Sequence, residues 1–271
     1  MRLCICNEMF EERPVGKVID FIAGLGYEGI EIAPFTLADH ADDIPADLRA
    51  QIRKQAADAG IEIAGLHWLL VKPAGLHIGA RDEETRKRTV DYLKSLARLC
   101  ADLGGQVMVF GSPNQRNTPE DVTHEANWAK AVESIREAGR YCQELGVILA
   151  MEPLRRDLTN FINNAAECRR FIGEVDVPAV RMILDCYSMN PEETSISAAL
   201  RSQADVLAHV HLNDDTGREP GTGSIDFAAV GRTLREIGYS GFASIEVFEF
   251  KPDAETIATR GMAHLRATFA G

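Results

Sequence analysis

The sequence is poor in several features that define particular classes of protein. It holds six cysteines in 271 residues, and none of them forms a Cys-x-x-Cys pair, which argues against a disulfide scaffold and against a thiolate zinc site. No apolar run approaches the roughly 18 residues of a membrane-spanning helix. The first residues also lack the apolar segment and small-residue cleavage site of a signal peptide. We therefore expect a cytoplasmic protein with reduced cysteines and no membrane partner.

The sequence also has fewer basic than acidic side chains. The chain has 29 Lys and Arg against 41 Asp and Glu, a formal net charge of −12. Nucleic-acid binding depends on clustered cations, so a nucleic-acid partner is not expected. A small anionic ligand held by a few local arginines stays open, and so does a homo-oligomer.

What the sequence does contain is a series of apolar segments that end on residues able to bind a metal ion. Residues 147–153 read Val-Ile-Leu-Ala-Met-Glu-Pro, a buried-strand pattern that ends on Glu152 before a proline. Similar segments lead into Asp185, His211 and Glu246. Successive members lie about 30 residues apart, the length of one strand–helix unit. An ionisable group at the end of a buried strand needs a partner, because unpaired burial is costly.

A helix, a glycine and a strand recur along the chain. We expect eight strands, at residues 3–6, 27–33, 61–66, 107–110, 147–153, 180–186, 206–212 and 242–247. We expect eight helices, at residues 14–25, 45–59, 83–103, 119–145, 165–173, 192–201, 227–237 and 254–269. This alternation predicts an α/β protein, a single-domain (β/α)₈ TIM barrel over residues 1–271. A doubly wound open sheet is the competitor, but its Gly-x-Gly-x-x-Gly fingerprint is missing from the first turn.

In such a barrel the carboxyl ends of the strands converge, so Glu152, Asp185, His211 and Glu246 are expected to meet. Neighbouring carboxylates repel one another unless a cation lies among them. Oxygen ligands and one imidazole favour one divalent ion, Mn²⁺, Co²⁺ or Mg²⁺, with Zn²⁺ as a further candidate. A single acid at a strand end is more often salt-bridged or capping, but four ligands in register point to metal. His209 is more simply interpreted as a histidine of the barrel interior.

Several short motifs resemble those of one superfamily. They are Met-Glu-Pro-Leu at 151–154, Leu-Asp-x-x-x-Met-Asn at 184–190, His-x-His-Leu at 209–212 and Ser-Ile-Glu at 244–246. With them the chain resembles the xylose isomerase-like sugar isomerase/epimerase superfamily, a family of TIM barrels. The segments 190–195 and 220–226 are similar to the ketose 3-epimerase branch.

The resemblance implies a divalent ion held by the four residues named above. It also implies that Glu152 and Glu246 flank the substrate and exchange protons with the carbon beside a carbonyl. We therefore expect a metal-dependent sugar (ketose) isomerase or epimerase that works through an enediolate. The epimerases carry a glutamate where this chain has Leu158, and a histidine where it has Ser188. A metal-dependent lyase or dehydratase acting on a keto-sugar or keto-inositol therefore stays as the alternative, beside a non-catalytic sugar-binding module.

Further residues are candidates for substrate binding at the same mouth. His67 is expected to hydrogen-bond the substrate and Trp68 to form an apolar wall against it. Glu31 is equally consistent with pairing to a loop arginine. Ser188 occupies the position of a substrate-binding histidine in the resembled family.

Three arginines follow expected strands: Arg116, Arg156 and Arg218. Together they could clamp a carboxylate or phosphate. Separately, each is an ordinary solvated loop charge.

Overall fold

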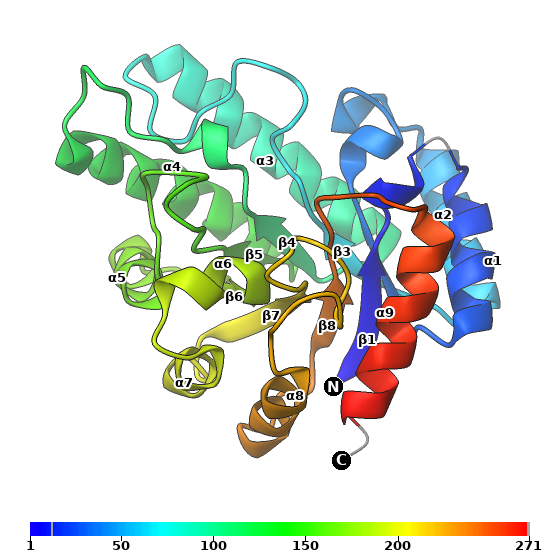
Figure 1. The fold of residues 1–271 in the computed structure, drawn as a ribbon. Coiled ribbons are helices and arrows are strands. Elements are labelled where there is room, and N and C mark those ends of the chain that lie inside the picture. The colour runs from blue at the N-terminus through cyan, green and yellow to red at the C-terminus, as the bar shows by residue number, and fades with distance from the viewer. Residues whose placement is uncertain (12, 270–271) are drawn as a thin grey trace.

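A closed ring of eight parallel strands forms the centre of the computed structural model, which describes residues 1–11 and 13–269 (Figure 1). The strands are β1 Arg2–Cys6, β2 Gly29–Ile32, β3 Glu62–Leu66, β4 Val107–Phe110, β5 Ile148–Met151, β6 Val180–Asp185, β7 Leu207–Leu212 and β8 Phe242–Ile245. They pair in chain order, and β1 closes the ring by pairing with β8, with Ile5 opposite Ile245. The expected (β/α)₈ barrel is confirmed.

Helices surround the ring on the outside, as Figure 1 shows. Among the described residues they are α1 Val15–Leu25, α2 Ala46–Asp58, α3 Glu83–Leu103, α4 His124–Glu144, α5 Ala165–Val175, α6 Cys186–Glu192, α7 Ile196–Ser202, α8 Phe227–Glu236 and α9 Ala254–Phe269. Short 3₁₀ turns follow β1, β2 and β4 or precede α2: η1 Glu8–Phe10, η2 Pro34–Thr36, η3 Ala41–Asp43 and η4 Pro113–Gln115.

Local sequence explains where these helices begin and end. The Asp82 carboxylate accepts a hydrogen bond from the Thr85 N–H at 2.8 Å and caps the start of α3. The same helix ends at Gly104, whose φ of +85° is a left-handed conformation that glycine adopts without steric cost. Most of the expected helix boundaries agree with the structure to within a few residues.

The region after β6 differs from the expectation. A single helix over 192–201 was expected there, with Pro191 at its start, but the structure has two helices, α6 and α7. The reason is a cap: Asp185 Oδ1 accepts a hydrogen bond from the Ser188 N–H at 2.6 Å, so a helix starts directly after the strand. Pro191 lies in the last turn of α6, where its missing N–H helps to end the helix.

The interior of the barrel is part apolar and part polar. Val107, Val109, Ala150 and Ile183 form one buried apolar cluster. Glu31 and His209 are buried polar residues, each about 1% exposed. Because side chains two residues apart on a strand share a face, His209 lies one layer below His211. A polar layer therefore lies directly beneath the strand ends. Nowhere in residues 1–11 or 13–269 is there a helix both long and apolar enough to cross a membrane.

Candidate active site

The four expected metal ligands converge at the carboxyl ends of the last four strands. Glu152 directly follows β5, Asp185 ends β6, His211 lies in β7 and Glu246 directly follows β8. Asp185 and His211 are register partners in adjacent strands. One ligand atom from each of the four residues lies within 4.8 Å of the others, and all four residues are buried. The structure thus brings together residues that span almost a hundred positions of sequence.

Hydrogen bonds orient part of this four-residue cluster. His211 Nδ1 lies 3.0 Å from Glu246 Oε2. Asp185 uses Oδ1 to cap α6, while its Oδ2 is buried and has no hydrogen-bond partner. A buried carboxylate oxygen without a partner is costly, so this atom points to a missing cation or other donor.

Burial and mutual repulsion shift the pKa values of the carboxyl groups in this cluster. Burial, followed by repulsion from Glu246 and Asp185, raises the pKa of Glu152 well above its usual value. Burial and then Glu246 raise the pKa of Asp185 to about 6. Burial acts in the same direction on Glu246, but attraction to His211 outweighs it and lowers the pKa of Glu246 overall. Three carboxyl groups therefore compete for the positive charge of one imidazole.

A divalent cation would remove this competition. Three carboxylates and one imidazole form an oxygen-rich ligand set with a single nitrogen, which suits a hard or borderline ion. The unpartnered Asp185 Oδ2 supplies a free ligand atom. The residues present therefore fit one divalent metal ion.

A fourth carboxylate, that of Glu31, contacts the cluster through His211. Glu31 Oε2 lies 3.2 Å from His211 Nε2 and 2.8 Å from His209 Nε2. His209 Nε2 is also 3.2 Å from the Ser244 hydroxyl. Burial raises the pKa of Glu31, but attraction to the two histidines outweighs it and holds that pKa well below its usual value. Glu31 thus pairs with histidines rather than with a loop arginine, and His209 is a residue of the barrel interior.

His67 has a partner that the sequence interpretation missed. Its Nε2 lies 2.7 Å from Glu8 Oε2, and both side chains are buried. Burial raises the pKa of Glu8 even though attraction to His67 acts against it. Glu8 stands just after β1, so the same strand-end pattern that revealed the four ligands could have indicated it.

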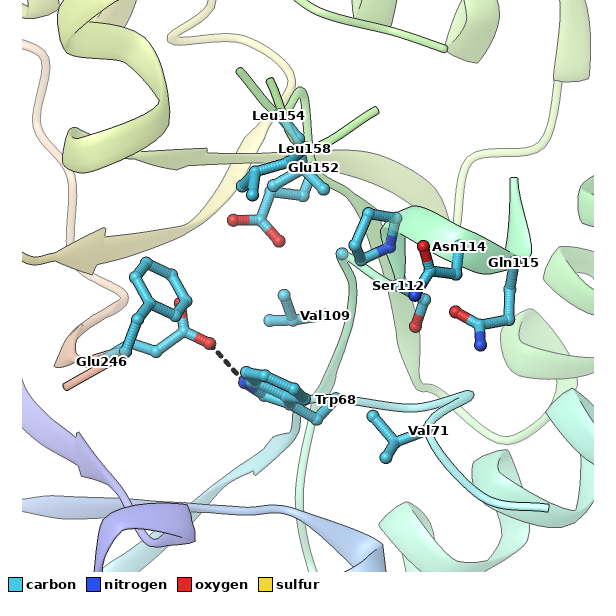
Figure 2. Close-up of a pocket in the computed structure, with 13 residues that line it drawn as sticks. Trp68, Val71, Val109, Ser112, Asn114, Gln115, Glu152, Leu154, Leu158 and Glu246 are labelled. Atoms are coloured by element: carbon cyan, nitrogen blue, oxygen red, sulfur yellow. Dashed lines mark hydrogen bonds between the residues drawn. The ribbon is translucent and has the colours of Figure 1, made fainter. Parts of the chain in front are cut away.

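Trp68 touches one of the two glutamates directly. Its indole N–H donates to Glu246 Oε1 at 2.9 Å, the dashed line in Figure 2. The Trp68 backbone has a φ of +53°, which a bulky residue rarely adopts. Ser112, which also lines the cavity, has a positive φ as well, +25°. Such strain clusters at functional sites because the surrounding structure must hold it in place.

A cavity of ≈ 320 Å³ opens above the two glutamates. Figure 2 shows Glu152 at the upper edge of it, Glu246 at the left and Trp68 at the lower edge, where the dashed line joins Trp68 to Glu246. Ser112, Asn114 and Gln115, which follow β4, form a polar corner at the right in Figure 2, and no pattern in the sequence indicated their position at the site. The site thus offers two acids facing one ligand from two directions.

Comparison with known proteins agrees with this architecture. Residues 19–268 match the protein family described as xylose isomerase-like TIM barrel. The chain belongs to this family. The D-psicose 3-epimerase of Ruminiclostridium cellulolyticum is 31% identical over 235 residues, which cover 85% of this chain and 77% of that protein. The 3-dehydro-D-guloside 4-epimerase of Escherichia coli is 26% identical over 253 residues, 91% of this chain and 92% of that protein.

A solved structure shows the same fold. The D-psicose 3-epimerase with D-tagatose from Clostridium cellulolyticum H10 has a TM-score of 0.87, with 23% identity and 99% of both chains covered. This xylose isomerase-like barrel therefore keeps the fold of those enzymes over its whole described length.

The structure places the two residues that stand where the resembled ketose 3-epimerases are expected to carry a glutamate and a histidine. Leu158 lies in the cavity wall beside Glu152. Ser188 is fully buried in α6, and its hydroxyl has no hydrogen-bond partner. Direct substrate contact by Ser188 stays a prediction.

The three arginines do not form the joint clamp that was considered for them. Arg116 is buried and donates from Nη1 to the backbone carbonyl of Glu152 at 2.6 Å, so it supports the backbone at the end of β5. Burial lowers its pKa to about 10, against the opposing attraction of Glu152.

The other two arginines have partners of their own. Arg156 donates from Nε to Glu192 Oε2 at 3.1 Å. Arg218 donates from Nη2 to the backbone carbonyl of Lys251 at 2.7 Å. None of the three arginines is among the described residues that line the cavity. Their hydrogen bonds hold them away from it. A role in substrate binding for any of them stays a prediction.

Proposed function

We propose that the protein is a divalent-metal-dependent sugar epimerase or isomerase that moves a proton on the carbon beside a carbonyl. The observation that carries this proposal is that Glu152 and Glu246 line two sides of one cavity and both belong to the same four-residue ligand cluster. Relatives that are named as sugar epimerases support it.

Glu152, Asp185, His211 and Glu246 would hold one ion, with Mn²⁺, Co²⁺ or Mg²⁺ as candidates. When bound, the ion would polarise the carbonyl and hydroxyl oxygens of the substrate and so favour an enediolate. One glutamate would remove the proton from the carbon beside the carbonyl. The other would return a proton from the opposite face, which inverts that carbon. Trp68 would hold the Glu246 carboxylate in the orientation that this transfer needs.

The substrate class follows from the same reasoning and from the relatives. Proton transfer beside a carbonyl requires a sugar with a carbonyl group, and the relatives named for D-psicose and for a 3-dehydro-D-guloside favour a keto-sugar. We also propose a reducing, cytoplasmic location, since the six cysteines are unpaired and buried.

Solvent deuterium exchange tests the proton-transfer role. The Mn²⁺-loaded protein is incubated in D₂O with a panel of keto-sugars, and deuterium at the carbon beside the carbonyl is measured by NMR. We expect exchange with the native protein and a loss of about 10²- to 10⁴-fold in Glu246→Gln, because the amide cannot accept the proton. Metal content of the variant is measured in parallel.

One outcome of this experiment would overturn the proposed role of Glu246. If Glu246→Gln retains metal and exchanges deuterium at the native rate, Glu246 does not transfer the proton. A metal-dependent lyase or dehydratase is the second candidate, because Leu158 stands in the wall beside Glu152 where the ketose 3-epimerases resembled by the sequence carry an acid. That activity would release water or a fragment, which the same NMR spectra would reveal.

A further inference from the structure

The entrance of the cavity gathers most of the exposed large apolar side chains of the described chain. Five such residues are at least one-third exposed, and four of them line this cavity: Trp68, Val71, Leu158 and Phe248. The fifth, Leu145, follows α4 at the other end of the barrel, just before β5. Exposed apolar residues that collect at one concave site mark a binding surface, whereas scattered ones do not.

The wall of the cavity is apolar well below its entrance. Val109 and Leu154 line it together with Leu158, as Figure 2 shows. An aromatic ring such as Trp68 can stack on the C–H face of any sugar, so it does not by itself select a substrate. The aliphatic side chains do select, because sugar hydroxyl groups buried against them would lose their hydrogen bonds to water without replacement.

The charges around the cavity also favour a neutral substrate. Among the described lining residues, the only ionisable side chains are Glu152 and Glu246. An anionic group on the substrate would meet no cation there other than the metal ion itself. A phosphorylated or carboxylated substrate would therefore be disfavoured.

We propose that the outer part of this cavity binds an apolar substituent, so that the substrate is a neutral keto-sugar that carries an alkyl or aryl group, such as an alkyl or aryl glycoside. This inference rests on the proposed function for the keto group, which would face the two glutamates. The polar corner of Ser112, Asn114 and Gln115 would hydrogen-bond the sugar hydroxyls. The substituent would lie between Leu158 and Phe248.

Binding of unreactive glycosides tests the inference separately from catalysis. Phenyl β-D-glucopyranoside and methyl β-D-glucopyranoside are titrated into the Mn²⁺-loaded protein by calorimetry. We expect the phenyl compound to bind at least about tenfold more tightly, because a buried phenyl ring adds that much affinity. Leu158→Gln should remove most of this preference. Leu145→Gln, an equally exposed leucine outside the cavity, is the matched control and should keep it.

The possible outcomes separate the inference from the function on which it rests. Equal affinities for the two glycosides, or an unchanged preference in Leu158→Gln, would overturn the inference even if deuterium exchange with free keto-sugars is found. A clear phenyl preference without exchange of any keto-sugar would instead overturn the epimerase function. If Leu158→Gln alters the mass of the particle in light scattering but not the phenyl preference, the apolar entrance is a contact between copies of the chain, and the inference is wrong.

Discussion

Replacing Trp68 by phenylalanine tests the contact between this residue and Glu246, one of the two glutamates that we propose transfer the proton. Phenylalanine keeps an aromatic surface in the cavity wall but lacks the N–H that donates to Glu246 Oε1 at 2.9 Å. The variant therefore removes one hydrogen bond and leaves most of the apolar wall in place.

The expected size of the effect follows from the environment of that bond. A hydrogen bond to a charged acceptor contributes about 1.5–3 kcal/mol. Because Trp68 is 37% exposed, water can replace part of the lost interaction, and the lower figure applies. A loss of about 1.5 kcal/mol in the transition state corresponds to a fall of about tenfold in kcat. KM should change by less than kcat, since the ring still contacts the substrate.

Steady-state kinetics with the keto-sugar that exchanges fastest provides the measurement. Trp128→Phe is the matched control, because the Trp128 indole also donates to a glutamate, Glu174, at 2.7 Å, but on the outside of the barrel. It should leave kcat unchanged. If Trp68→Phe keeps the native kcat and raises only KM, Trp68 contacts the substrate as part of the cavity wall and does not orient Glu246.

Three other predictions concern the metal and its support. In the chelator-treated protein, the pKa of Asp185 is raised by burial and by Glu246 from 3.8 to about 6, so the folded state binds the proton more tightly than the unfolded state. Stability should then fall as pH rises above 3.8 and through the folded-state pKa of about 6, by about 1–2 kcal/mol from pH 5 to pH 7.5 in urea unfolding, and Mn²⁺ should restore it. Glu31→Gln should weaken Mn²⁺ binding by about 10- to 100-fold in calorimetry, because Glu31 orients the His211 ring. Gly111→Ala should lower kcat by about 10²-fold, because the added methyl group would overlap Glu152 Oε2 and displace it.

Each of these has a control and an outcome that contradicts it. Asp185→Asn should reduce the pH dependence of the metal-free protein, while Glu152, whose pKa is also raised, keeps part of it; a slope that is unchanged in this variant refutes the assignment. Native Mn²⁺ affinity in Glu31→Gln would mean that the His211 ring needs no support from below. Gly173→Ala, at a helical glycine with open space around it, should keep full activity, and an equal loss there would show that the Gly111 effect is not local.

The barrel and the convergence of the four ligands could be predicted because both follow from local patterns. A buried strand that ends on Glu152 or Asp185 is visible within seven residues of sequence, and barrel closure then brings the ends together. Their roles as ligands remain predictions. The helix directly after Asp185 was missed, because one carboxylate that is read as a metal ligand also serves as a helix cap.

Contacts between distant segments could not be predicted in the same way. The bond from Trp68 to Glu246 joins residues 178 positions apart, and nothing in either segment indicates the other. The pair of Glu8 and His67 spans 59 positions and depends on a 3₁₀ turn whose sequence is unremarkable. Such pairs exist only once the strands have assembled into the barrel.

Because the barrel closes, the two halves of the chain contribute different groups to one site. All four candidate ligands come from the second half, whereas Glu31 and Trp68, which hold His211 and Glu246 in place, come from the first. A fragment that contains only β5 to β8 would carry all four candidate metal ligands. It would lack Glu31 and Trp68, which orient two of them. Exchange of the first half between relatives is therefore a route to altered activity that leaves the set of metal donors intact.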